Sequence, residues 1–567
     1  MVPALILVIT PRPVLGHFTI RMRKESCVPV FESTLDVNSK EFAQNRADML
    51  ALVERLRELE ERAKQASAKA KERFDKRGQL LPRERLALLI DRGAPFLDIG
   101  TLSGFKRDDP DPEKSIPGGG LIAGIGYISG TRCVITVNDA GINAGAMSEG
   151  GGDKLLRCQD LALANGMPYV QLVESAGANL PRYKVEGFVR GGSIFRNLAR
   201  LSAAGCPVVT VLHGSSTAGG AYMPGLSDYV IAIRGRAKAF LAGPPLLKAA
   251  TGEIATDEEL GGAEMHATVS GLAEYMAEDD AEGIAIAREV VAKLAMNRHT
   301  KFLDQSNVKP PKYNPDELAG LIPMDYRKPY DMKEVVARLV DGSDILEFKP
   351  LYGSQTVCVQ GHIMGHPCAF IGNNGPIDNQ GATKAAQFIQ LCCQSKTPII
   401  YLQNTTGYMV GTDTETGGMI KHGSKMIQAV SNATTPQITL MIGASFGAGN
   451  YGMCGRGYDP RFLFSWPNTQ TGVMGGEQAA MVMSIVAEAG AKRKGIEVDH
   501  DAIAAQEKFI IDLFASQSDS FHTSGMFLDD GMIDPRDTRD VLGFVLATIY
   551  EAEHRETFPS SFGVARM

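Results

Sequence analysis

The sequence predicts an α/β protein made of two copies of one domain, and three observations carry this prediction. The chain has 567 residues, which exceeds what one hydrophobic core usually serves, so two to four domains are expected. Short apolar runs in the first half of the chain have counterparts in the second half, in the same order. Helical patterns lie between these runs, and alternating strands and helices favour parallel sheets with right-handed crossovers.

Three pairs of apolar runs define the repeat. The matching segments are 133–139 with 368–374, 168–177 with 398–407, and 207–214 with 436–443. Their offsets along the chain are 235, 230 and 229 residues. Each run is short and closes on glycine or a polar turn, as a buried strand does. Because order and spacing agree, we expect two halves related by duplication, with helices near Lys154–Asn165 and Lys384–Gln394.

The segments outside the repeat have other compositions. Residues 47–80 are charged and carry leucines at helical spacing, but the apolar pattern stops within about two heptads. A surface helix that packs on a partner subunit is therefore favoured over a coiled coil. Residues 83–91 add a short amphipathic segment. Residues 309–315 are rich in proline, which indicates an extended linker between the halves.

The first forty residues are expected to form a flexible tail. Residues 1–10 are apolar, but Pro3 interrupts them and the run is too short to span a bilayer. A secretory signal would carry positive charge before the apolar run, and this one does not. A disordered tail, or a start at Met22, is favoured, and organelle targeting stays an alternative.

Charge and cysteine content exclude several functions. The net charge is −7 and the pI about 5.9, so the chain has no basic footprint for nucleic acid. Nine cysteines are scattered without a CxxC pair or a His/Cys spacing that would hold zinc. We therefore expect reduced thiols, no metal site and a cytoplasmic enzyme without a membrane segment.

A glycine-rich turn follows the third matched run in each half. These turns are residues 215–222 and 444–451, and a helix is expected to start after each. Small residues at a strand-to-helix turn leave backbone N–H groups able to bind an oxyanion, helped by the helix dipole. No Lys-Ser or Lys-Thr follows the glycines, so a phosphate-binding loop is disfavoured. Tight packing alone could explain one such turn, but two matched turns weaken that explanation.

Two oxyanion sites suggest that two carbonyl groups meet between paired domains. One would become an enolate and the other a leaving urea anion, and this chemistry needs no side-chain nucleophile. The sequence has no Gly-x-Ser-x-Gly motif, and Ser175 and Ser216 have no histidine partner evident from their spacing. His213 precedes the first turn, but a single histidine on a strand is more often structural.

These motifs resemble those of the carboxyltransferase (β) subunits of biotin-dependent acyl-CoA carboxylases. The resemblance covers about residues 40–555 and is carried by residues 217–222, 240–245, 248–253, 445–453 and 474–480. It implies that each half adopts the crotonase-like (ClpP-like) β-β-α superhelix fold. The implied domains are a tail at 1–40, an acyl-CoA domain at 41–305, a linker at 306–332 and a biotin domain at 333–567.

The resemblance also implies a role for each turn. Gly219 and Gly220 would hold the enolate oxygen of an acyl-CoA thioester, and Ala448 and Gly449, with Gly447 nearby, the ureido oxygen of biotin. Carboxybiotin would release CO2, its ureido nitrogen would take a proton from the acyl chain, and the enolate or dienolate would attack CO2. Further acyl-CoA contacts are implied at Ala176, Gly177, Gly191, Gly192, Ala218, Ala221 and Tyr222. Further biotin contacts are implied at Thr406, Gly407, Phe446, Asn450, Gly475 and Gly476, and candidate contacts to the CoA phosphates are Arg182, Lys184 and Lys248.

The chain would need a partner to complete this reaction. It lacks the Ala-Met-Lys-Met biotinylation sequence and shows no convincing ATP-binding motif. A separate α subunit would therefore carry biotin and the biotin carboxylase activity. The resemblance implies a β6 core within an α6β6 holoenzyme, in which the amino-terminal half of one subunit faces the carboxyl-terminal half of another.

One position bears on the acyl group. Methylcrotonyl-type subunits have a large Phe where this chain has Gly191, within residues 189–195. A buried Phe side chain covers about 150–250 Å² of surface, so its absence would open a channel for a longer branched chain such as geranyl. Residues 373–377 also look more like geranyl-type subunits. Geranyl-CoA is therefore favoured and methylcrotonyl-CoA is the alternative, which would connect the enzyme to terpene or leucine catabolism.

Two further alternatives come from other classes of protein. A crotonase-type hydratase would need a carboxylate pair at the turns and would not need a second half. A non-enzymatic scaffold would not need glycine turns preserved in both halves.

Overall fold

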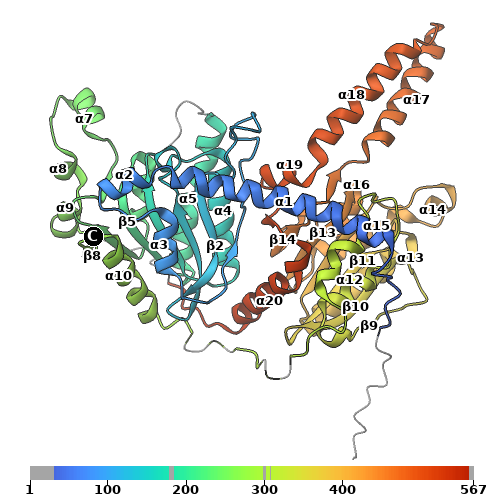
Figure 1. The fold of residues 1–567 in the computed structure, drawn as a ribbon, viewed down its shortest axis with the longest axis horizontal. Coiled ribbons are helices and arrows are strands. Elements are labelled where there is room, and N and C mark those ends of the chain that lie inside the picture. The colour runs from blue at the N-terminus through green and yellow to red at the C-terminus, as the bar shows by residue number, and fades with distance from the viewer. Residues whose placement is uncertain are drawn as a thin grey trace, which may run out of the picture.

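The computed structural model describes residues 31–177, 184–297, 300, 302–304, 306 and 308–560. Most of the predicted tail, and the candidate Arg182, lie outside these described residues. Two mixed β-sheets, one in each half of the chain, form the body of the molecule and are covered by helices (Figure 1). The predicted α/β class is confirmed.

The first sheet has the order β1-β2-β3-β4-β5-β6-β8, with β7 paired to β5. Its strands are β1 (Leu97–Asp98), β2 (Leu121–Ile128), β3 (Thr131–Asn138), β4 (Tyr169–Ser175), β5 (Val208–Thr217), β6 (Tyr229–Ile233), β7 (Lys238–Phe240) and β8 (Tyr275–Ala277). The second sheet has the order β16-β14-β13-β12-β11-β10-β9, with β15 paired to β13. Its strands are β9 (Leu346–Glu347), β10 (Thr356–Ile363), β11 (His366–Asn373), β12 (Ile399–Thr405), β13 (Gln437–Phe446), β14 (Phe462–Ser465), β15 (Gln470–Gly472) and β16 (Gly531–Met532).

The two sheets have the same topology, strand for strand. β3, β4 and β5 begin 235, 230 and 229 residues before β11, β12 and β13, which confirms the predicted duplication. From β3 to β8 and from β11 to β16 the paired strands are parallel, as predicted.

One edge of each sheet differs from the prediction of purely parallel strands. The strands β1, β2 and β3 pair antiparallel, and so do β9, β10 and β11. The reason is a two-residue turn in each half, Ser129-Gly130 and Met364-Gly365, in which both residues have positive φ. Such turns match the twist of antiparallel strands and close a hairpin.

The helices of the first half are α1 (Lys40–Ala68), α2 (Lys71–Lys76), α3 (Pro82–Leu89), η1 (Asn143–Gly145), α4 (Glu149–Ala164), α5 (Val185–Ala203), η3 (Ala218–Ala221), α6 (Tyr222–Gly225), α7 (Pro244–Thr251), α8 (Asp257–Gly261), α9 (Ala263–Thr268) and α10 (Asp280–Lys293). Those of the second half are η4 (Pro315–Glu317), α11 (Leu318–Leu321), α12 (Met332–Leu339), η5 (Asp341–Ser343), α13 (Asn379–Ser395), α14 (Thr412–Thr416), α15 (Met419–Ser431), α16 (Gly447–Gly452), η6 (Arg456–Tyr458), α17 (Gly476–Lys494), α18 (His500–Ser518), α19 (Ser520–Gly525), η7 (Pro535–Asp537) and α20 (Thr538–His554). The two helices expected between matched strands are thus present as α4 and α13.

Strand residues alternate between two layers of helices, as a period of two requires. In the first sheet Val208 and Leu212 share a hydrophobic cluster with α4 and α5, while Val209 and Val211 share one with α3 and α10. In the second sheet α13 and α15 cover one face, and α12 and α20 the other. Both faces of each sheet are buried, which explains why the sequence shows short apolar runs rather than an alternating pattern.

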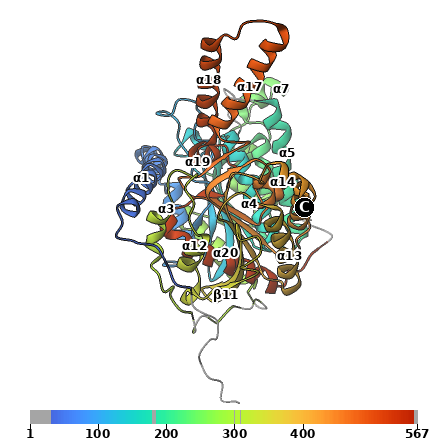
Figure 2. The same ribbon diagram turned by 90° about the vertical axis from the view of Figure 1, so that its right-hand side faces the viewer.

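The long helix α1 packs on both halves (Figures 1 and 2). It lies along α11, which precedes the second sheet. Its apolar residues belong to a cluster with side chains from both halves: Leu56, Leu59, Leu102, Phe105, Phe521 and Met532. The apolar face of α1 is therefore buried within its own chain, and the expectation that it packs on a partner subunit is wrong.

The segment expected as a linker is only partly extended. Residues 308–314 have no helix or strand, as their composition indicated. They lead into η4 and α11, and Leu318 and Leu321 of α11 are buried. The predicted domain limits at 305 and 332 stay a prediction.

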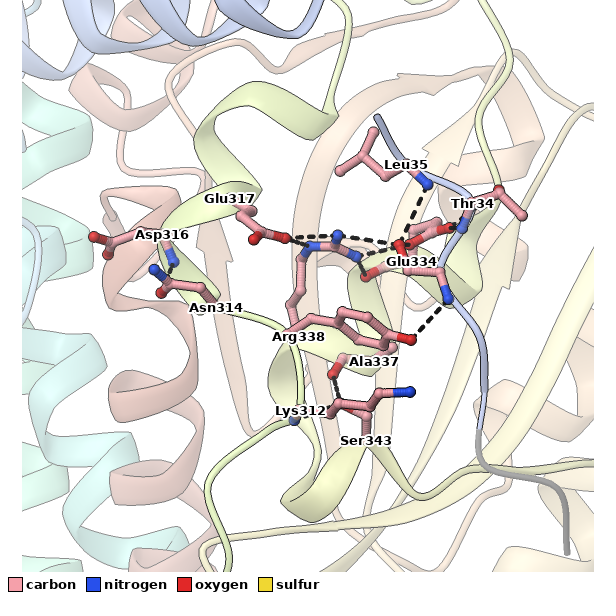
Figure 3. Close-up of polar contacts among 12 residues, drawn as sticks. Thr34, Leu35, Lys312, Asn314, Asp316, Glu317, Glu334, Ala337, Arg338 and Ser343 are labelled. Carbon is pink, nitrogen blue, oxygen red and sulfur yellow. Dashed lines mark hydrogen bonds and ion pairs between the residues drawn. The ribbon is translucent and has the colours of Figure 1, made fainter. Parts of the chain in front are cut away.

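A buried arginine ties the beginning of the described chain to the second half (Figure 3). Arg338 of α12 pairs with Glu317 at 2.7 Å and with Glu334 at 2.7 Å, and its side chain is 1 % exposed. Glu334 also accepts hydrogen bonds from the Thr34 N–H at 2.7 Å and from the Ser33 hydroxyl at 2.6 Å. One guanidinium therefore joins the N-terminal segment, η4 and α12.

Replacing Arg338 with methionine is expected to lower the free energy of unfolding by about 3 kcal/mol, because Glu334 and the partly buried Glu317 lose their counter-charge. Chemical denaturation followed by circular dichroism measures the loss. Arg57→Met is the matched control, since Arg57 pairs with Glu60 at 3.0 Å but is half exposed. The control should lose no more than about 1 kcal/mol. Equal stability of the two variants would contradict this account of Arg338.

A hairpin of two long helices, α17 and α18, projects from the second half (Figures 1 and 2). We call this hairpin the arm (residues 476–518). Of its hydrophobic residues, Ala479, Ala480 and Ile510 are buried. Large apolar side chains are exposed along both of its helices: Met481, Val482, Met483, Ile485, Val486, Phe509, Ile511 and Leu513. Such a concentration of exposed apolar side chains marks an interaction surface.

Within the described ranges, no helix has both the length and the apolar character needed to cross a membrane.

Candidate active site

Two equivalent turns stand where the sequence predicted them. β5 ends at Thr217 and leads into η3 and α6, and β13 ends at Phe446 and leads into α16. The first residues after these strands, Ala218 and Gly447, both have a left-handed backbone, with φ of 54° and 55°. This conformation is strained for alanine, so the fold imposes it on the first turn as well as on the second. The two turns therefore direct the N–H groups at the start of their helices in the same way, and such groups have no carbonyl partner one turn back.

A bulge at the base of each turn sets its direction. In the first half Val173 pairs with Leu212, but Ser175 pairs with Ser216, so one residue of β4 lies opposite three of β5. The second half repeats this pattern, with one residue of β12 opposite three of β13. A bulge bends the strand that carries the extra residues. Each glycine turn thus follows the same irregularity in the pairing of its strand.

The neighbouring glycines are held in the same way in both halves. The Gly177 N–H donates to the Ser175 hydroxyl at 3.1 Å, and the Gly407 N–H donates to the Thr405 hydroxyl at 3.2 Å. Both glycines have positive φ, 87° and 127°. The Gly177 carbonyl also accepts the Met147 N–H at 2.8 Å. The Thr217 hydroxyl donates to the Ala176 carbonyl at 3.4 Å, and a Cβ added to Gly449 would lie 2.9 Å from Cα of Gly407. Ala176 and Gly177 therefore lie beside the first turn, and Thr406 and Gly407 beside the second, while their contacts with acyl-CoA and biotin stay predictions.

An aromatic pair lies against the first turn. The rings of Phe195 and Tyr222 meet edge to face at 5.8 Å. A Cβ added to Gly219 would lie 3.5 Å from Cζ of Phe195. Phe195 comes from α5 and lies within residues 189–195, the stretch that the sequence connected with the acyl group, although Phe195 was not itself predicted as a contact. The hydroxyl of Ser216 donates to the Gly220 carbonyl at 2.8 Å, which fixes the turn from inside.

Gly191 and Gly192 lie in α5, near the aromatic pair. Gly191 precedes Phe195 by four residues, so both lie on one face of this helix. A Cβ added to Gly191 or to Gly192 would meet nothing within 4 Å. No described residue therefore occupies the position next to either backbone, where Gly191 is half-buried and Gly192 is exposed.

The second turn packs more tightly than the first. A Cβ added to Gly449 would lie 2.9 Å from Cα of Gly407 and 2.9 Å from Cγ2 of Thr405, so only glycine fits. The Asn450 amide donates to the Ser445 hydroxyl at 2.7 Å. The amide group of Asn450, a predicted biotin contact, thus forms its hydrogen bond within the turn itself.

Tyr326 reaches this turn from the segment expected as a linker. Its ring meets that of Phe446 edge to face at 5.2 Å. Its hydroxyl lies 2.7 Å from where a Cβ of Gly475 would be, so Gly475 is needed for this approach. Gly475 caps α17 and Gly476 begins it, which places the root of the arm at the second turn. No motif in the sequence identified Tyr326, because its partners are more than a hundred residues away.

Three residues considered from the sequence, Lys184, Lys248 and His213, lie outside the two turns. Lys184 pairs with Glu149 at 2.9 Å, and Lys248 lies in the last turn of α7. His213 is fully buried and its Nδ1 lies 2.8 Å from Oδ1 of Asp280, which agrees with a structural role. Among the described residues, no group of three or more His, Cys, Asp or Glu side chains is placed to hold a metal ion.

Comparisons with known proteins identify the family of this chain. The sequence profile of the carboxyl transferase domain matches residues 73–564. The crystal structure of the geranyl-CoA carboxylase β subunit of P. aeruginosa superposes with a TM-score of 0.89 at 53 % identity, over 95 % of this chain and 100 % of that one. A probable biotin-dependent acyl-coenzyme A carboxylase β2 subunit of Mycobacterium tuberculosis is 47 % identical over 540 residues, 95 % of this chain and all of that protein. The probable mitochondrial methylcrotonoyl-CoA carboxylase β chain of Drosophila melanogaster is 40 % identical over 573 residues, 98 % of each chain.

The chain has two matched α/β halves and the sequence profile covers most of it, so the chain belongs to the carboxyl transferase domain family. Within that family it is the carboxyltransferase (β) subunit of a biotin-dependent acyl-CoA carboxylase, of the type that includes the geranyl-CoA and methylcrotonyl-CoA enzymes. The hydratase and scaffold alternatives are thereby set aside.

Proposed function

We propose that the chain moves a carboxyl group from carboxybiotin to geranyl-CoA, at the γ position on the methyl-group carbon, through a dienolate. The observation that carries this proposal is the pair of equivalent turns. Each half presents helix-start N–H groups at the end of a bulged strand, and each turn begins with the same left-handed residue conformation. Two such sites serve a reaction in which two carbonyl groups gain negative charge.

The first turn is proposed to hold the acyl-CoA. The N–H groups of Gly219 and Gly220 would donate to the thioester oxygen as it becomes a dienolate oxygen. Ala176, Gly177, Ala218, Ala221 and Tyr222 would line the same position, because the structure gathers them around this turn. Phe195 joins this set, since it packs on Tyr222 beside Gly219.

The second turn is proposed to hold biotin. The N–H groups of Ala448 and Gly449 would donate to the ureido oxygen, with Gly447 setting their direction. The approach of Gly449 to Gly407 supports this, because a bare backbone surface of glycines admits a flat ring that side chains would block. Phe446, Asn450, Thr406, Gly475 and Gly476 border this surface. Biotin supplies the carboxyl group, as CO2, and a ureido nitrogen able to accept the acyl proton.

Geranyl-CoA is proposed over methylcrotonyl-CoA because of Gly191. The open space beside Gly191 lies on the face of α5 that carries Phe195, next to the first turn. The higher identity to a geranyl-CoA carboxylase, 53 % against 40 % for a methylcrotonoyl-CoA carboxylase, supports the same choice. Methylcrotonyl-CoA is the alternative substrate.

The proposed partners are a biotinylated α subunit with biotin carboxylase activity and further copies of this chain. The α subunit is required because this chain lacks a biotinylation sequence. A β6 core within an α6β6 holoenzyme is supported by the arm, whose apolar side chains need a partner surface. We also propose a cytoplasmic location, in keeping with the eight free cysteines among the described residues.

Charges placed on the arm are expected to break the β6 core. Ile485 and Val486 are each 60 % exposed on α17, and glutamates at both positions would oppose burial against another subunit. Light scattering coupled to size-exclusion chromatography measures the mass of the assembly. Leu351→Glu is the control, because Leu351 is a fully exposed residue on a loop outside the arm. An arm variant with the mass of the unaltered assembly would contradict the proposed role of the arm.

The proposed reaction is tested with the reconstituted holoenzyme. The purified chain and its biotinylated partner are supplied with ATP, bicarbonate and a panel of acyl-CoA thioesters. The expected result is carboxylation of geranyl-CoA with the highest kcat/KM, abolished when biotin is sequestered by avidin. Carboxylation of methylcrotonyl-CoA alone would establish the alternative substrate, and turnover without the biotinylated partner would contradict the proposal.

A further inference from the structure

We propose that Arg85, Glu174, His213 and Asp280 form a positioning network that fixes the first turn for its reaction with the thioester. This inference rests on the proposed function, because that function places the acyl-CoA at the first turn. None of the four side chains belongs to the predicted acyl-CoA or biotin contacts. They act through the backbone of the turn, not on the substrate.

The network is a chain of short polar contacts. Arg85 of α3 pairs with Glu174 at 2.6 Å and with Asp280 at 3.2 Å. Asp280 in turn bonds His213 at 2.8 Å and accepts the Leu80 N–H at 2.7 Å. The side chains of Arg85, His213 and Asp280 are at most 2 % exposed, and that of Glu174 is 13 % exposed. The contacts therefore lie in a low-dielectric interior, where charge pairs hold their geometry firmly.

The network sits at the bulge below the first turn. Glu174 is the single residue of β4 that lies opposite His213, Gly214 and Ser215 of β5. A Cβ added to Gly214 would lie 2.6 Å from Cγ of Glu174, so the Glu174 side chain presses on the bulge itself. His213 comes from the same bulge and is held by Asp280 from α10. Both sides of the bulge are thus anchored by charged groups from other elements.

The second half provides an internal comparison. The residues equivalent to Glu174, His213 and Gly214 are Asn404, Ile442 and Gly443, by the offsets of the paired strands. There the Asn404 side-chain oxygen accepts the Ala444 N–H at 3.1 Å and holds the bulge directly. In the second half, one hydrogen bond to a neutral amide holds the bulge, whereas four charged or polar side chains surround the bulge in the first half. The charged network is therefore specific to the half proposed to bind the acyl-CoA.

The protonation states keep the network intact near neutral pH. Burial and the charge of Arg85 lower the pKa of His213 to about 4, against the effect of Asp280. Burial alone would raise the pKa of Asp280, but its hydrogen bond with His213 and the charge of Arg85 lower that pKa to about 2. Neutral His213 therefore donates its Nδ1–H to ionised Asp280. Arg236, 3.8 Å from Asp280, and Gln79, which donates to the His213 carbonyl at 3.3 Å, complete the surroundings.

Glu174→Gln tests the proposal, because glutamine keeps the shape of the side chain and removes its charge. The expected result is a fall of at least about tenfold in kcat for acyl-CoA carboxylation, since a small misplacement of donor groups slows a reaction strongly. Decarboxylation of carboxybiotin without acyl-CoA, which depends on the second turn, should stay within about twofold. A loss of folded protein would lower both activities equally, so their ratio separates positioning from stability.

Glu551→Gln is the matched control. Glu551 of α20 pairs at 2.6 Å with buried Arg132, which lies in the first half at the end of β3 away from the turns. This variant should lose thermal stability without changing the ratio of the two activities. If Glu174→Gln does not fold, Asp280→Asn, which keeps the shape of the side chain and removes the charge that pairs with Arg85, carries the same expectation. A ratio unchanged in either variant would overturn the network, whereas an inactive unaltered holoenzyme would instead overturn the proposed function.

Discussion

Replacing Gly449 with alanine is expected to reduce carboxyl transfer by at least about 100-fold, the loss seen when one oxyanion donor is removed. The added Cβ would lie 2.9 Å from Cα of Gly407 and from Cγ2 of Thr405. Both neighbours are fixed, because one is backbone and the other is held at the end of β12 by its own hydroxyl bond. The second turn must therefore move, and its N–H groups would no longer point toward the proposed position of the ureido oxygen. Initial rates of the holoenzyme with saturating acyl-CoA measure the effect.

Gly457→Ala is the control for this variant. A Cβ added at Gly457 meets nothing within 4 Å, and the residue lies in the same half of the chain. Its activity should remain within about twofold of the unaltered enzyme. A Gly449→Ala enzyme that keeps more than about a tenth of its rate would contradict the role of the second turn.

Gly191→Phe is expected to abolish the use of geranyl-CoA while sparing methylcrotonyl-CoA. The new ring would fill the space on the Phe195 face of α5 and block the longer chain. A loss of several methylenes of contact, at about 0.8 kcal/mol each, predicts a fall of at least about 100-fold in kcat/KM for geranyl-CoA. Competing the two thioesters in one assay, with products separated by chromatography, gives the ratio of kcat/KM values directly.

Gly191→Ala is the matched control, because its methyl group meets nothing within 4 Å. It should retain both substrates, since alanine is also the better helix former. Equal losses on both thioesters in Gly191→Phe would remove the argument for a channel. A loss of geranyl-CoA use in Gly191→Ala would show that the helix, rather than the space, matters.

Much of the fold could be predicted because duplication leaves a local record. The strands β4 and β12 carry apolar runs with similar neighbours, and their offset of 230 residues is visible in the chain itself. The hairpins at Ser129-Gly130 and Met364-Gly365 were missed, because serine and methionine are not typical residues for such turns. The packing of α1 was misjudged, since an apolar face does not reveal which surface covers it.

The residues of the candidate site likewise fall into those that the sequence predicted and those that it did not. The glycine turns were predicted because each one consists of consecutive residues, from Thr217 to Tyr222 and from Phe446 to Tyr451. Tyr326 and the network around Glu174 were not, because their contacts join segments far apart in the chain. Only packing brings these groups to the turns, and packing is not local in sequence.

The proposed function places the acyl-CoA at the first turn and biotin at the second. Titration calorimetry of geranyl-CoA into the chain alone separates these two roles when the unaltered protein, Gly219→Val and Gly449→Ala are compared. Valine at 219 would crowd Phe195, which lies 3.5 Å from a Cβ there. Gly219→Val is expected to bind geranyl-CoA at least about tenfold more weakly, and Gly449→Ala to change the affinity by no more than about twofold. Equal weakening by both variants, or weakening by Gly449→Ala alone, would contradict this assignment of roles.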